Sequence, residues 1–212
     1  MKQSLFVVLV FIIGCVAGSV FELDWDLHDA SLYILYALML QVGISVGSSD
    51  NLKEMIKNFH PKMLLLPLGT VTGTLLFSAM ASLLLFRYHW SATDCMAVGS
   101  GMGYYSVSSI IITQLKMESL GAQLATELGT IALLANICRE ISALVFAPLL
   151  VRFFGPLATI SAAGVTSVDV AMPAIVRYSG KEMIPVALFH GMMLDLSVPF
   201  AGSVPLRTLI HR

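Results

Sequence analysis

The stretch Leu124–Val151, LATELGTIALLANICREISALVFAPLLV, is a long apolar run that contains the charged residues Glu127, Arg139 and Glu140. A helix needs about 20 apolar residues to cross the roughly 30 Å hydrocarbon core of a bilayer. A charge at mid-membrane costs about 2.5–3.5 kcal/mol on insertion scales. The run therefore predicts a membrane-spanning helix whose charges face a partner or a cavity instead of lipid.

The composition of the whole chain agrees with this interpretation. Of its 212 residues, 57% are hydrophobic and only 12% are charged, and the mean hydropathy is +0.86. A soluble domain has about a quarter of its residues charged, so this chain is expected to lie in the lipid bilayer. The net charge of -1 gives no basic surface for nucleic acid. Three cysteines scattered through apolar runs predict no disulfide, no metal site and no cofactor.

Similar apolar runs recur along the chain and predict an all-α, polytopic transmembrane helix bundle, which forms a single integral membrane domain over residues 1–212. We expect about seven hydrophobic segments, of which two are interrupted or re-entrant. Lysine and arginine placement favours a cytoplasmic N-terminus in the cell inner membrane. The segments are Leu5–Phe21, Ser31–Gly47, Met63–Phe86, Met96–Leu115, Leu124–Val151, Pro156–Val176 and Met183–Leu206.

Two of these segments share an internal similarity. Ala97-Val98-Gly99 opens one segment and Ala162-Ala163-Gly164 opens another, at an offset of 65 residues, and both are interrupted by small or polar residues. Paired interrupted segments are typical of a transport site, because unwound backbone offers N–H and C=O groups to a ligand. The match is short, and chance similarity remains the alternative.

Glu140 is the main candidate for substrate binding. Asn136 lies one turn before it, so both side chains share a helix face. The alternative is structural: Arg139 pairs with a carboxylate on another helix, for which Asp195 is the candidate.

Asp169, with Thr166 and Ser167 just before it, is a second candidate for a cation site. The alternative is that Asp169 caps the helix that follows. The segment Gly99–Ser106 predicts a polar cavity, or else close helix packing. Glu127 and His190 are candidates for proton or ion coupling, although a solvated acid and a structural histidine are the simpler interpretations. The remaining binding candidates are Gly101, Gly103, Tyr104, Tyr105 and Ser106.

Several phrases spread in order along the chain resemble the lysine exporter LysO family. They are Gln41–Gly47 before Asp50-Asn51-Leu52, Ala97–Ser109, Asn136–Glu140, Thr166–Pro173 and Pro185–Gly191. The resemblance implies export of L-lysine, and of its thia-analogue, with Glu140 as the functional acid of this half. Full-length relatives begin with additional spans, so the resemblance covers their C-terminal part. We therefore expect a separate small membrane protein to supply those helices, and leave assembly into an oligomer open.

Export of lysine is the main hypothesis, and proton antiport is its expected energy source. A cation/proton antiporter would use the same buried acids, and a non-transporting membrane scaffold would need none of them. An intramembrane enzyme has no support, because no Ser/His pair or H-E-x-x-H spacing occurs.

Overall fold

A computed structural model describes residues 61–85 and 90–207, together with scattered positions before residue 45. Within these residues every regular element is helical, which confirms the all-α prediction. The first two predicted segments, Leu5–Phe21 and Ser31–Gly47, lie largely outside the described residues. The elements are η1 (Pro61–Leu64), α4 (Leu65–Ala81), α5 (Ala92–Gly99), α6 (Tyr105–Leu120), α7 (Ala122–Val145), α8 (Ala147–Phe154), α9 (Leu157–Ala163), η3 (Gly164–Val168), α10 (Met172–Tyr178), η4 (Lys181–Met183) and α11 (Ile184–Arg207).

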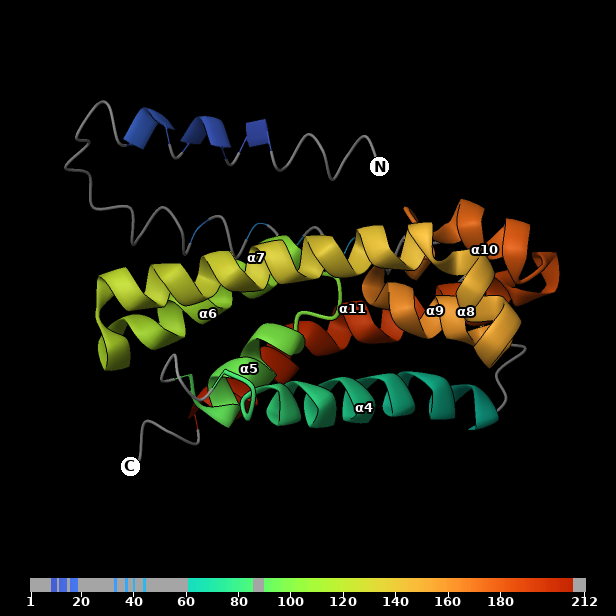
Figure 1. Ribbon diagram of the computed structural model, residues 1–212, viewed down its shortest axis with the longest axis horizontal. Coiled ribbons are helices and arrows are strands. Elements are labelled where there is room, and N and C mark those ends of the chain that lie inside the picture. The colour runs from blue at the N-terminus through green and yellow to red at the C-terminus, as the bar shows by residue number, and fades with distance from the viewer. Residues whose placement is uncertain are drawn as a thin grey trace.

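Two helical stretches in the described part are long and apolar enough to cross a membrane, Pro61–Ala81 and Ala122–Val145. In Figure 1, α4 and α7 run along the long axis of the molecule on opposite sides, and α5 and α11 lie between them. Helix α6 packs along α7, while α8, α9 and α10 lie together at the end of the bundle away from α5 (Figure 1). The total of about seven hydrophobic segments stays a prediction.

The predicted long helix Leu124–Val151 is wrong in one respect, because the structure divides it. Helix α7 ends at Val145, and α8 begins at Ala147 with Pro148 in its first turn. Proline has no N–H and its ring clashes with the carbonyl four residues earlier, here that of Leu144. The helix therefore stops and restarts in a new direction.

The segment Met96–Leu115 is interrupted, as predicted, and its two helices fold back on each other. Ser91 caps the start of α5 in a capping box with Asp94, and α5 ends at Gly99 before α6 begins at Tyr105. The Lys116 ammonium near the end of α6 lies 2.7 Å from the Asp94 carboxylate at the start of α5. Because the two ends of the segment meet, α5 and α6 form a helical hairpin, and a re-entrant path through the membrane stays a prediction.

The segment Pro156–Val176 is also interrupted. Helix α9 ends at Ala163, a 3-10 turn covers Gly164–Val168, and α10 begins at Met172. Gly164 has φ +68, a backbone region that favours glycine. Both interruptions therefore lie where the sequence places small or polar residues.

Candidate transport site

The two interruptions touch each other inside the bundle. The backbone N–H of Val165 donates to the carbonyl of Met102 over 2.9 Å. A Cβ on Gly164 would lie 2.0 Å from that same carbonyl oxygen, and one on Gly103 would lie 3.0 Å from the Ala163 carbonyl oxygen. The absence of side chains on these glycines therefore allows main chain to contact main chain. We call the contact between residues 101–104 and 163–166 the crossing.

Asn136 on α7 holds the first interruption in place. Its Oδ1 accepts from the Gly103 N–H over 2.8 Å, and its Nδ2 donates to the carbonyls of Val98 and Ala132 over 3.2 and 2.8 Å. The side chain is 3% exposed. Asn136 thus supplies hydrogen bonds that the interrupted helix cannot make for itself.

Arg139 on the same helix holds the second interruption. Its Nε and Nη2 donate to the carbonyls of Ala162 and Ser161 over 2.9 and 3.0 Å, and its Nη1 donates to Thr74 Oγ1 over 3.3 Å. The last carbonyls of a helix have no partner in that helix and carry partial negative charge. The guanidinium therefore satisfies the end of α9.

The predicted ion pair between Arg139 and Asp195 is wrong. Across 61–85 and 90–207, the side-chain ion pair is the one between Lys116 and Asp94, and Asp195 makes none with Arg139. The physical reason is that α9 presents carbonyl oxygens to the guanidinium, whereas Asp195 on α11 interacts electrostatically with Asp169.

Two tyrosines border the crossing, and three carboxylates act on them electrostatically. Tyr105 interacts electrostatically with Glu140 and Asp169. Tyr104 interacts with Asp195 and Asp169. Glu140 is 1% exposed, whereas Asp169 is exposed and Asp195 is partly buried. We call these five residues the acid–tyrosine cluster, and its surplus of carboxylates suits a cationic ligand.

The structure rejects the capping alternative for Asp169. Helix α10 has Ala171 as its N-cap and no side-chain cap, and the Asp169 carboxylate accepts from the neighbouring Val170 N–H. The Asp169 side chain therefore stays with the interruption.

The hydroxyls of the predicted binding residues Thr166 and Ser167 donate to backbone carbonyls. Thr166 donates to Ala163 over 3.0 Å and Ser167 to Ala187 over 2.9 Å. Gly101 fits the close-packing alternative, since a Cβ there would lie 2.5 Å from Asn136 Nδ2. Ser106 is half-buried in the first turn of α6.

His190 is completely buried and joins several elements. Its Nε2 lies 2.9 Å from Thr70 Oγ1 and its Nδ1 lies 3.4 Å from Ser167 Oγ. Thr70 also pairs with Ser161 over 2.7 Å. These contacts join His190 on α11 directly to α4 and to η3, which is a structural position. Glu127 is exposed near the start of α7, away from the cluster.

Sequence reasoning missed the polar residues of α4 and the pair formed by Asp94 and Lys116. Thr70, Thr74 and Ser78 are spaced four residues apart, so they form a stripe along one helix face. This stripe touches His190, Arg139 and the Gly99 region. The regular spacing of hydroxyls in an otherwise apolar helix was the signal that could have revealed it.

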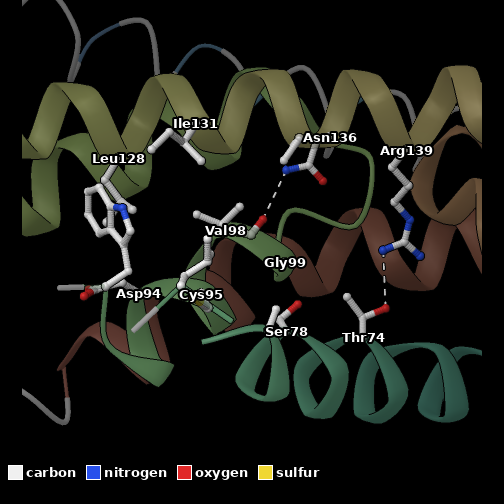
Figure 2. A pocket seen from close by; sticks show the side chains of 14 residues that line it. Thr74, Ser78, Asp94, Cys95, Val98, Gly99, Leu128, Ile131, Asn136 and Arg139 are labelled. Atoms are coloured by element: carbon white, nitrogen blue, oxygen red, sulfur yellow. Dashed lines mark hydrogen bonds between the residues drawn. The ribbon is translucent and has the colours of Figure 1, made fainter. Parts of the chain in front are cut away.

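Arg139 lines two cavities. The first, of about 380 Å³, lies between α4, α5 and α7, and Figure 2 shows Asp94 and Arg139 at its opposite ends. The second, of about 660 Å³, lies between α4, α8 and α9. Thr74 and Arg139 line both cavities. Gly69 and Gly73 line the second, with nothing within 4 Å of a Cβ on either.

The family model for the lysine exporter LysO matches residues 8–205. The chain belongs to the lysine exporter LysO family. A Haemophilus influenzae relative with the name "Putative lysine exporter" is 30% identical over 205 residues, which cover 92% of this chain and 96% of the relative. The Escherichia coli protein "Lysine exporter LysO" is 30% identical over 172 residues, 81% of this chain and 53% of that protein. The chain thus spans about half the length of the E. coli relative. No solved structure matches it.

Membership of the LysO family makes this chain a membrane protein of a transporter family, in agreement with its composition and its two long apolar helices. The family also supports amino-acid export as the general activity. The site residues named above are assigned from geometry and chemistry.

Replacing Asn136 with alanine is expected to lower stability by about 1–3 kcal/mol, because the Gly103 N–H and the Val98 carbonyl lose a buried partner. Thermal unfolding of the purified protein in detergent measures the loss. Thr126→Ala is the control, since it removes an exposed hydroxyl that donates within the same helix. Equal unfolding temperatures for the two variants would contradict the role of Asn136.

Proposed function

We propose that this protein exports L-lysine, and its thia-analogue, from the cytoplasm across the cell inner membrane. The observation that carries the proposal is the acid–tyrosine cluster beside the crossing. Lysine carries two ammonium groups, and carboxylates bind ammonium groups through strong, charge-assisted hydrogen bonds. Membership of the LysO family supports the same substrate.

Glu140 and Asp169 are the groups to which we assign the ammonium groups. Asp169 is exposed and Glu140 is buried, and Tyr105 interacts with both. Asp195 adds a third carboxylate on the side of Tyr104.

Proton antiport is the proposed source of energy. Moving a net positive lysine outward opposes an inside-negative potential and costs about 2.3 kcal/mol per charge per 100 mV. An inward proton offsets that cost. Glu140 would then alternate between a proton and lysine, so that the two cannot be bound together. His190 and Glu127 are further proposed coupling residues. His190 is hydrogen-bonded to Thr70 and Glu127 is exposed, so both also fit the simpler interpretations.

Glu140→Gln is expected to reduce lysine efflux by about tenfold or more, because the amide keeps the shape of the side chain but cannot pair with an ammonium. Efflux of labelled lysine from preloaded cells measures the effect, with the amount of protein in the membrane checked alongside. The matched control is Glu182→Gln, which changes an exposed acid in η4 to its amide in the same way and should leave efflux unchanged.

Unchanged lysine efflux in Glu140→Gln would overturn the proposed site. The two alternatives give different results. A cation/proton antiporter would move inorganic cations without a lysine flux. A non-transporting scaffold would tolerate Glu140→Gln and Asp169→Asn together.

The small membrane protein expected to supply additional helices, and an oligomeric assembly, both stay predictions. Gentle purification from native membranes, followed by identification of the copurifying chains, tests them. Full lysine transport by this chain alone in vesicles would contradict a required second subunit.

A further inference from the structure

Arg139 lines both cavities, and we call its position between them the junction. The first cavity follows the C-terminal half of α4 and the second follows its N-terminal half, with Thr74 shared between them. The cavities therefore follow one another along the axis of a helix long enough to cross the membrane. The first is bounded by α5 and the second by α8 and α9, which Figure 1 shows at opposite ends of the bundle.

The charge of Arg139 has no carboxylate partner in the part of the chain that the structure describes. A guanidinium has five N–H groups, and three hydrogen bonds, to Ala162, Ser161 and Thr74, use part of this capacity. A cation at membrane depth is expensive unless an anion or strong dipoles accompany it. The carbonyls of α9 provide dipoles, and N–H groups remain for an anionic guest.

Four backbone N–H groups of the crossing already donate hydrogen bonds, so they compete poorly with Arg139 for a substrate carboxylate. The N–H of Gly103 is bound to Asn136 and that of Val165 to Met102. The N–H groups of Met102 and Tyr104 donate to the carbonyls of Gly99 and Gly101. A carboxylate placed at the interruptions would have to break these bonds.

We propose that Arg139 binds the carboxylate of the transported amino acid at the junction of the two cavities. This inference rests on the proposed lysine export and assigns one end of its substrate. The planar guanidinium matches a carboxylate in geometry as well as in charge. Because Arg139 lines both cavities, the same group meets the carboxylate from either side.

Comparison of lysine with its methyl ester tests the proposal, because the two differ in the negative charge of the carboxylate. Each competes, unlabelled, against labelled lysine for transport by the full protein in membrane vesicles. In the unmodified protein lysine should compete at least about tenfold better than the ester. In the Arg139→Gln variant, lysine should compete no better than the ester does. The ester should compete as well as it does in the unmodified protein.

Thr74→Val is the matched control for this comparison. It removes the hydroxyl that accepts from Arg139 Nη1 but keeps the guanidinium, so lysine should still compete better than the ester. A parallel loss of both competitors in Arg139→Gln would show that Arg139 acts only by holding α9, and would overturn the proposal.

A second measurement covers the case in which Arg139→Gln fails to fold. Ser78 lines the first cavity, so Ser78→Cys, with the three native cysteines replaced, offers a thiol near the junction. Lysine should slow its reaction with a small maleimide and the methyl ester should not. Equal protection by both, or by neither, would overturn the proposal. An unmodified protein that exports no lysine would instead contradict the proposed function.

Discussion

Replacing Gly164 with alanine is expected to abolish export and to cause a large loss of stability. The new Cβ would lie 2.0 Å from the Met102 carbonyl oxygen, and φ is +68 at this residue. The backbone strain contributes about 1–3 kcal/mol and the overlap about the same again. Relief of the overlap requires the two interruptions to separate, so the Val165–Met102 hydrogen bond is lost as well. Thermal unfolding in detergent and lysine efflux measure the two effects.

Gly155→Ala is the matched control. Gly155 has φ +86, and nothing lies within 4 Å of a Cβ placed there. The control therefore carries the backbone strain without the overlap, and should lose stability while retaining export. Similar losses of export in both variants would contradict the importance of the crossing.

Breaking the ion pair between Lys116 and Asp94 is expected to cause the second large loss of stability. The two side chains are 6% and 10% exposed and their charged atoms are 2.7 Å apart. Lys116→Met leaves the Asp94 carboxylate buried without its cation, and we expect a loss of about 3–5 kcal/mol in unfolding free energy. The α5–α6 hairpin should open first, because this pair joins its two ends.

The double variant Lys116→Met with Asp94→Asn separates the charge from the packing. Removing both charges should restore a substantial part of the stability, since no uncompensated ion remains. The introduced amide would retain an oxygen that accepts from the Ser91 N–H, as the Asp94 carboxylate does. A double variant as unstable as Lys116→Met would show that the ion pair is not the source of the effect.

The sequence was sufficient to predict that two apolar segments are interrupted. Glycines and polar residues occur in both segments, 65 residues apart, and indicate the interruptions directly. It was not sufficient to predict that Met102 and Val165 touch, since that contact joins segments distant along the chain. The contact also depends on α7, whose side chains bind both interruptions. The division of α7 from α8 is signalled by Pro148. Hydrophobicity alone does not reveal it, because the apolar run continues unbroken through the proline.

The partners of Arg139 could not have been predicted from residue types. A charged side chain suggests an opposite charge, and Asp195 was the available candidate. The actual partners include two main-chain carbonyls, which every residue carries and which become distinctive only where a helix ends. The same reasoning applies to Asn136. By contrast, Glu140, Tyr105 and Asp169, which the sequence put forward as binding candidates, do interact electrostatically, and their role in binding stays a prediction.

The two interruptions are joined through peptide groups, and this has a consequence for redesign. A bond between the Val165 amide and the Met102 carbonyl is indifferent to which side chains surround it. Side chains proposed to bind the substrate, such as Glu140 and Asp169, can then be exchanged while the backbone contact between the two interruptions is kept. Variants selected for shorter or longer diamino acids should therefore accumulate changes around this junction and leave its two small residues, Gly103 and Gly164, untouched.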